Sequence, residues 1–148
     1  MRSDKEKPIQ IEANQVDIDD KNGISTYSGS VRLTQGSMRL LAQKIIVYSD
    51  DRKLSRVVAT GNPALFSQRP DDSPGDVEAQ AMKVDYSALD GVLTLTNQAK
   101  LAQGGNEFQG NRIEYETHNH IVRAMANEAG DQRVKVVIQP ESLNEKKK

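Results

Sequence analysis

The two histidines of the chain, His118 and His120, lie two residues apart in the segment THNH. A His-x-His pair on a strand places both imidazoles on one face, where they can bind a metal ion such as zinc. A metal site needs further ligands, and no third ligand of suitable type lies at a convincing spacing. The segment is typical of an exposed turn, so we predict no metal site here.

Three pairs of adjacent aspartates offer carboxylates for acid–base catalysis or for calcium binding. They are Asp19/Asp20, Asp50/Asp51 and Asp71/Asp72. Each pair lies beside Lys, Arg, Asn, Ser or Pro, residues that are typical of turns. We therefore interpret the three pairs as solvated turns.

The serines and the glycine-rich segment also lack the context that chemistry requires. No serine occupies a nucleophile elbow or has a plausible histidine partner. The segment AQGGN has the composition of a hairpin turn rather than of a phosphate-binding loop. We predict no catalytic residue, no metal and no cofactor.

The composition narrows the class of protein. The chain has 148 residues, a net charge of −1, no cysteine, no tryptophan and 4% aromatic residues. One domain or two small lobes are expected from this length. The balanced charge and scarce aromatics argue against nucleic-acid binding, and the absence of cysteine excludes disulfides. No apolar run approaches the roughly 20 residues that span a bilayer. The N-terminus has no signal-peptide pattern, which fits either a cytosolic protein or a mature secreted one.

Any site would have to be positioned by strands, because apolar and polar residues alternate with a period of two along the whole chain. Short strands separated by Gly, Asn and Asp turns predict an all-β, antiparallel fold. The expected strands are 9–13, 15–19, 25–27, 30–34, 37–42, 44–48, 56–60 and 64–68, and then 76–79, 82–86, 92–96, 99–102, 106–109, 111–115, 120–126 and 133–139. The segment 69–76 is the expected loop between the two series.

The two series of strands resemble each other. An offset of 68 residues pairs Gly36 with Gly104, and the same offset pairs Gly23 with Gly91, Thr26 with Thr94, Leu33 with Leu101, Gln35 with Gln103 and Val47 with Tyr115. Such self-similarity indicates one structural plan used twice. We expect residues 1–7 to be a flexible N-terminus, 8–139 a single domain with repeats at about 9–68 and 76–139, and 140–148 a charged flexible tail.

Alternation gives each strand an apolar face that must be buried, and two stacked sheets of a jelly roll satisfy this requirement. Taken alone, the pattern favours an interior filled by its own side chains over one that holds a guest. The predicted interior consists of Ile9, Ile11, Val16, Ile18, Val31, Leu33, Leu40, Ile45, Val47, Phe66, Met82, Val84, Tyr86, Leu101, Phe108, Ile113 and Tyr115.

The two ends of such a roll are open to strand addition. Good strand formers lie near both ends of the chain, and flanking charges are the alternative feature that would keep these edges apart. The expected head-to-tail edges carry Ile9 and Ile11 at one end, and Val134, Val136 and Ile138 at the other.

The order and spacing of several loose motifs resemble the OstA-like family. The motifs are PIxIEA, SGSVRLTQGSMRLLAQKIIVY, GNPALF and GNRIEYE, within a resemblance that spans about Pro8 to Gln139. This resemblance implies an open antiparallel β-jellyroll, a twisted two-sheet sandwich with an apolar groove, built from two similar halves. It also implies that the groove, rather than a self-filled core, is the binding site.

The resemblance further implies a role in lipopolysaccharide transport. Family members bind lipid A acyl chains in the groove and carry lipopolysaccharide across the periplasm. They do so in a head-to-tail bridge with other copies and with inner-membrane anchored and outer-membrane OstA-like domains. By position, Ile9 and Ile11 match the groove mouth, and Phe66 and Tyr86 match aromatic interior positions. We therefore expect a periplasmic protein in its mature form.

Two other functions stay open at this point. A structural or adhesion-type β scaffold with a self-filled core would share the alternation but would take up no lipid. A carbohydrate-active β enzyme would need a carboxylate pair on an exposed sheet face, and none is apparent.

Overall fold

The computed structural model describes residues 7–51, 53–69, 76–127 and 133–139. Its described residues contain no helix, and so none that could cross a membrane. The predicted all-β antiparallel fold is confirmed. The strands are β1 (Ile9–Glu12), β2 (Gln15–Asp19), β3 (Ile24–Gln35), β4 (Met38–Asp50), β5 (Lys53–Gln68), β6 (Val77–Ser87), β7 (Val92–Gln103), β8 (Asn106–Glu116), β9 (Ile121–Met125) and β10 (Lys135–Val137).

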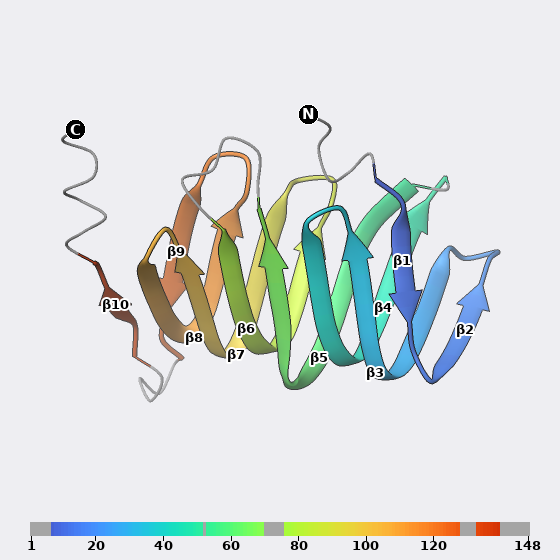
Figure 1. The fold of residues 1–148 in the computed structure, drawn as a ribbon, viewed down its shortest axis with the longest axis horizontal. Helices are drawn as coiled ribbons and strands as arrows, with labels where there is room; N and C mark the ends of the chain where they lie inside the picture. The colour runs from blue at the N-terminus through green and yellow to red at the C-terminus, as the bar shows by residue number, and fades with distance from the viewer. Residues whose placement is uncertain (1–6, 52, 70–75, 128–132, 140–148) are drawn as a thin grey trace.

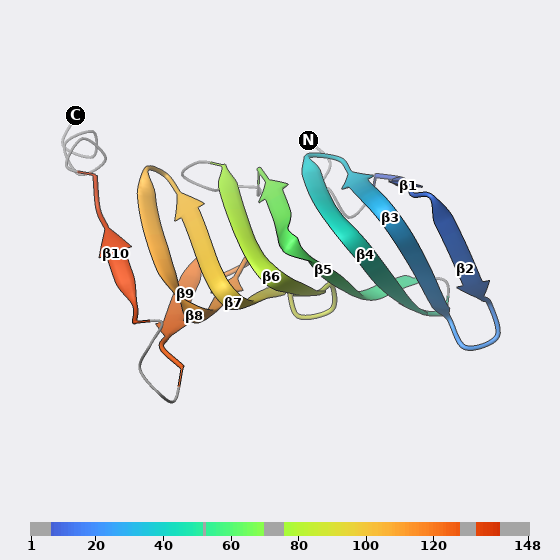
Figure 2. The same cartoon turned by 90° about the horizontal axis from the view of Figure 1, so that it is seen from below.

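All ten strands belong to one sheet with the order β1-β3-β4-β5-β6-β7-β8-β10, while β2 pairs with β3 and β9 with β8. The strands follow one another along the long axis of the molecule, with β1 and β2 at one end and β9 and β10 at the other (Figure 1). Sequential antiparallel pairing is what short hairpin turns produce. The same order is visible after a turn of 90° (Figure 2).

Twelve of the sixteen expected short strands are joined in pairs into the long strands β3 to β8, which corrects their predicted boundaries. The segment YSGS, predicted as a turn, lies inside β3, where the pairing with β4 shifts register between Ser28 and Val31. Gly29 and Ser30 have φ values of 85° and 47° there. These values suit a β-bulge as well as a turn, and a bulge bends a strand without ending its pairing.

A line of such irregularities crosses the sheet. Register shifts interrupt the β4–β5, β5–β6, β6–β7 and β7–β8 ladders near the middle of each strand. The sheet folds along this line into two facing layers, so the two predicted sheets are the two halves of one continuous sheet. Layer 1 contains β1, β10 and the segments 31–35, 38–42, 64–68, 77–81, 99–103 and 106–110. Layer 2 contains β2, β9 and the segments 24–28, 44–48, 56–60, 83–87, 92–96 and 112–116.

Away from the bulge line, each layer ends in a rim of turns. Rim 1, at the edge of layer 1, includes the β3–β4 and β7–β8 turns at Gly36 and Gly104. Rim 2, at the edge of layer 2, includes the β2–β3 and β6–β7 turns at Gly23 and Gly91. The glycines paired by the repeat have similar φ values, 60° and 58° on rim 1 and 69° and 71° on rim 2. Positive φ is the conformation that favours glycine.

Replacing Gly23 by alanine is expected to cost about 2–4 kcal/mol of unfolding free energy, because left-handed strain adds to a steric clash. A Cβ at this position would lie 2.3 Å from the carbonyl oxygen of Ser49. The Ser49 amide donates a hydrogen bond to the Gly23 carbonyl, so the turn cannot easily move away. Urea unfolding measures the loss.

Gly104→Ala is the matched control for this change. It has a φ of 58°, but no atom lies within 4 Å of the added Cβ. We expect a loss of about 1 kcal/mol from backbone strain alone. Equal losses in the two variants would contradict the role of the Ser49 contact.

Candidate functional site

The apolar faces of the two layers meet in one buried cluster that runs along the molecule. Eleven residues of the predicted interior belong to it, contributed by both layers. They are Val31, Leu33, Leu40, Ile45, Val47, Phe66, Val84, Tyr86, Leu101, Ile113 and Tyr115.

Contacts across the interior show how closely the layers approach. Phe66 belongs to layer 1 and Tyr86 to layer 2, and their ring centroids lie 6.3 Å apart at an interplanar angle of 36°. This distance falls within the range of favourable aromatic pairs. Leu33 and Ile45, from opposite layers, both have 0% exposure. The side chains of the two layers therefore bury each other along the middle of the roll.

Sequence analysis missed part of this cluster. Leu93 and Leu95 are fully buried on β7, as are Val57 on β5 and Val77 on β6. The alternation of leucine and threonine in β7 is the signal that could have found Leu93 and Leu95. Small residues complete the lining at Ala59, Ala64, Ala79, Ala81 and Ala99.

Met82 was expected in the interior, and the structure corrects this. Met82 is half-buried and lies outside the buried cluster, whereas its neighbour Ala81 has 0% exposure. The β6–β7 register shifts between Gln80 and Lys83. A bulge displaces the alternation by one residue, so the smaller side chain takes the inner position.

At the N-terminal end, several predicted interior residues share the inner face but are not enclosed. Val16 pairs with Tyr27, and Tyr27 pairs with the buried Ile45, so all three point to the same side. Val16 is nevertheless 47% exposed and Ile18 66% exposed, because β2 is the last strand of layer 2. Ile9 is exposed and Ile11 half-buried on β1, the last strand of layer 1.

The C-terminal end is similar. Phe108 is half-buried against the cluster, and Val136 of β10 lies opposite it with its side chain 47% exposed. Val134 and Ile138 are exposed and flank β10 rather than belonging to it, which shortens the predicted strand 133–139.

The described candidate chemical residues lie in turns or, as Asp19 and Asp50 do, at the strand ends beside them. His118 and His120 occupy the β8–β9 turn and are exposed, and Asp19 accepts hydrogen bonds from the backbone and side chain of Asn22 in the β2–β3 turn. Asp51 lies in the β4–β5 turn. The Asp71/Asp72 pair, the tail 140–148, most of the expected loop 69–76 and residues 1–6 lie outside the described residues. Within the described ranges, no group of three or more His, Asp or Glu side chains could hold a metal ion.

The two repeats, about 9–68 and 76–139, form the first and second halves of the roll along its long axis. Tyr115 connects the two rims in the second half. Its side chain comes from layer 2 and is 1% exposed. Gln103 of layer 1 donates from Nε2 to the Tyr115 Oη at 2.9 Å, and Nδ1 of His120 lies 3.3 Å from the same oxygen. We call this hydrogen-bonded bridge between Gln103 and Tyr115 the latch.

Burial raises the pKa of the Tyr115 hydroxyl above its usual value, and the hydrogen bond from Gln103 partly offsets this effect. The unfolded chain therefore releases this proton at a lower pH than the folded chain. The resulting contribution to stability is complete below about pH 10 and is lost as pH rises through the folded-state pKa.

Tyr115→Phe is expected to lower the unfolding free energy by about 1–2 kcal/mol at pH 7, through loss of the hydrogen bonds between the Tyr115 hydroxyl and Gln103 and His120. The variant should also lose less stability than the parent between about pH 9 and 11. Urea unfolding at several pH values measures both effects. The remaining tyrosines are common to both proteins, so parallel pH curves would contradict the assignment.

A cavity of about 490 Å³ opens between the rims, mainly in the first half of the roll but reaching Tyr86 and Ala88 at the start of the second. Lys7, Ile9 and Gln35 line it from the side of layer 1, and Lys53, Leu54, Tyr86 and Ala88 line it from the side of layer 2. It gives access to the buried cluster, because Tyr86 belongs to both.

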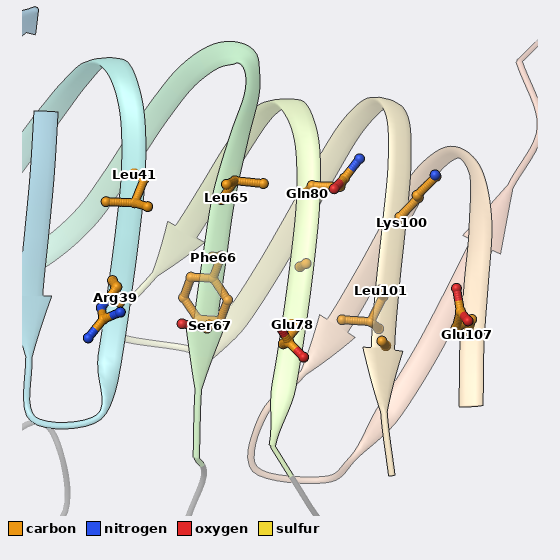
Figure 3. Close-up of a pocket in the computed structure, with 12 residues that line it drawn as sticks. Arg39, Leu41, Leu65, Phe66, Ser67, Glu78, Gln80, Lys100, Leu101 and Glu107 are labelled. Carbon is orange, nitrogen blue, oxygen red and sulfur yellow. The ribbon is translucent and has the colours of Figure 1, made fainter. Parts of the chain in front are cut away.

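A second hollow, of about 380 Å³, lies on the outer face of layer 1 (Figure 3). Leu41 and Leu65 are paired across neighbouring strands there, beside Gln80 and Lys100. Arg39, Glu78 and Glu107 add charges of both signs. This surface faces away from the apolar interior. Because it carries charges of both signs, it does not favour a ligand of one particular charge.

Other charges of the outer face pair with each other. Arg56 binds Asp85, which raises the pKa of the Arg56 guanidinium through their hydrogen bond. Arg123 and Asn119 hydrogen-bond to Glu116 and lower the pKa of its carboxyl. Such exposed pairs contribute little to stability. The outer face is thus polar around them, and the main apolar surface of the roll is its inner face.

Comparisons with known proteins agree on one family. Residues 10–121 match the family described as LptA/(LptD N-terminal domain) LPS transport protein. Lipopolysaccharide export system protein LptH of Pseudomonas aeruginosa is 34% identical over 145 residues, covering 93% of this chain and 82% of LptH. Lipopolysaccharide export system protein LptA of Haemophilus influenzae is 31% identical, covering 99% of this chain and 86% of LptA.

The fold is also found among solved structures. A crystal structure of LptH from Pseudomonas aeruginosa, the LptA-homologous periplasmic component of the conserved lipopolysaccharide transport device, superposes with a TM-score of 0.85. The two chains are 33% identical, and the match covers 94% of this chain and 100% of that one. Taken with the open antiparallel roll, these matches show that the chain belongs to the LptA/(LptD N-terminal domain) LPS transport protein family.

Proposed function

We propose that this periplasmic lipopolysaccharide-transport protein holds the acyl chains of lipid A between its two layers, as one link of a head-to-tail bridge. The proposal rests on one observation above all. The apolar inner face continues from the buried cluster to exposed residues at both ends of the roll, Val16 and Ile18 at one end and Val136 at the other. A continuous aliphatic surface allows acyl chains to move along the roll, whereas a single deep pocket would hold them in one place.

Acyl chains need space that the packed interior must provide. The ladder hydrogen bonds run between neighbouring strands, and the two layers are continuous only through the bulge line. Separation at the rims can therefore expose the inner face while the ladders stay intact. Each CH₂ group that enters contributes about 0.8 kcal/mol through burial, which offsets the lost contacts between the layers.

The ends of the roll support a bridge. Among the described strands, β1 and β10 each have one neighbour in layer 1, so each leaves an unpaired edge. Strand addition between β10 of one copy and β1 of the next would continue layer 1 and the apolar track together. The inner-membrane anchored and outer-membrane domains of the same family are the proposed partners at the two ends of the assembly.

Photo-crosslinking tests the lipid site. A photoreactive residue at Phe66 or Ile11 is expected to crosslink to lipopolysaccharide, since both side chains lie on the inner face. Leu65 is the matched control, because it is adjacent to Phe66 but points outward and is 41% exposed. Absence of crosslinks from both inner positions, or equal crosslinking from Leu65, would contradict the proposal.

A β scaffold with a self-filled core is the second candidate, and the 0% exposure of Leu33 and Ile45 favours it. It predicts that purified protein retains no lipopolysaccharide. Retention of lipid together with inner-face crosslinks would exclude it.

A further inference from the structure

The two halves of the roll differ in the hydrogen-bond partner of a glutamine that both contain. The repeat matches Gln35 with Gln103 and Val47 with Tyr115. In the second half, Gln103 donates to the Tyr115 hydroxyl and forms the latch between the rims. In the first half a valine stands at the tyrosine position and cannot accept a hydrogen bond, and Gln35 donates instead to the carbonyl of Lys7 at 3.1 Å. The rims are thus bridged in one half and separated by a cavity in the other.

The cavity combines an apolar floor with one lysine on each side of its opening. Leu54 and Ala88 are half-buried and Tyr86 is buried, so they form the floor. Lys7 and Lys53 are exposed and line the opening from opposite rims. Neither lysine forms an ion pair with any residue in the described ranges. Two carboxylates lie near this opening: Asp50, which is opposite Lys53 in the β4–β5 ladder, and Asp90 in the β6–β7 turn. Neither of them lines the cavity.

This arrangement matches an amphiphile with an anionic headgroup. Ammonium groups bind phosphate or carboxylate oxygens by charge-assisted hydrogen bonds, while an apolar floor accommodates a hydrocarbon chain. The volume of about 490 Å³ lies within the range of small-molecule sites. The floor leads inward, because the Tyr86 ring contacts Phe66 in the buried cluster.

We propose that this cavity is a lateral portal of the groove, where Lys7 and Lys53 hold the phosphate of the amphiphile while its acyl chains enter between the layers. The inference rests on the proposed function and adds to it the place of entry and the charge that is recognised there. The latch directs entry to the first half, because it bridges the rims of the second.

Binding of phosphorylated lipid A and of enzymatically dephosphorylated lipid A to the full chain tests the portal. The double variant Lys7→Glu/Lys53→Glu is expected to bind phosphorylated lipid A about tenfold more weakly, since two exposed charge contacts are reversed. Its affinity for dephosphorylated lipid A should change by less than about twofold. The conservative variant Lys7→Arg/Lys53→Arg should retain affinity for both lipids.

The matched control is Lys21→Glu/Lys44→Glu, which makes the same change in net charge at exposed lysines outside the cavity. Equal weakening in the control, or equal weakening toward the dephosphorylated lipid, would overturn the portal. Competition by inorganic phosphate alone at the affinity of the lipid would overturn it as well, because it would indicate a free-anion site. If the parent protein bound neither lipid, the proposed function itself would fail, whereas unchanged binding by the double variant would remove only the portal.

Discussion

Leu33→Asp is expected to unfold the protein. The side chain has 0% exposure and lies in the middle of the buried cluster. An aspartate there would lose the burial of leucine, about 2–5 kcal/mol, and would place an unpaired carboxylate away from water. Together these two losses of unfolding free energy are comparable to the whole stability of a typical single domain, about 5–15 kcal/mol. Circular dichroism and urea unfolding measure the loss of the folded state.

Arg32→Asp is the control, because Arg32 neighbours Leu33 on β3 but is exposed. We expect it to change stability by less than about 0.5 kcal/mol. If Leu33→Asp instead folded normally, the interior would have to be open to water, which would contradict the packed cluster between the layers.

Removing residues 134–139 is expected to abolish end-to-end assembly. The mean molar mass of the parent protein, measured by light scattering, should increase with protein concentration. The reason is that exposed apolar residues and unpaired strand edges lie at both ends of the roll. Without β10, layer 1 loses the edge strand that would pair with β1 of the next copy, and the truncated protein should stay monomeric over the same concentrations.

A point variant separates the edge from the rest of the segment. Val136→Glu places a charge on the exposed inner face of β10 and should prevent growth. Lys135→Glu changes the neighbouring position, which pairs with Gln109 on the outward side, and should have a much smaller effect. A parent protein that stays strictly monomeric at high concentration would contradict the head-to-tail proposal.

The sequence predicted the class of fold because a period of two is a local property that every strand repeats. Leu33, Ile45 and Leu101 were assigned to the inner face on this basis, and all three are buried. Alternation gives the face of a residue but not what covers it. Val16 and Ile18 therefore share the inner face and yet remain exposed at the end of layer 2.

Bulges explain most of the remaining differences. Gly29 and Ser30 have the positive φ values that a turn would need, so local composition does not distinguish a corner inside β3 from the end of a strand. The same ambiguity displaced Met82 from the interior in favour of Ala81.

The cavity could not be predicted from alternation, since it joins Lys7 and Lys53 from segments that pair with different strands. One signal was nevertheless present. The repeat aligns Val47 with Tyr115, and this difference between the two halves marks where the latch is absent.

The line of bulges gives the roll different stiffness in its two directions. Lengthwise, each strand is held to the next by the ladder hydrogen bonds, so stretching the roll breaks bonds in series. Crosswise, away from the bulge line, the layers are held mainly by side-chain contacts, each of which is individually weak. If acyl chains enter as proposed, the roll would widen while its length stays constant, and a chain of such units would keep the same spacing along its axis whether or not each unit holds lipid.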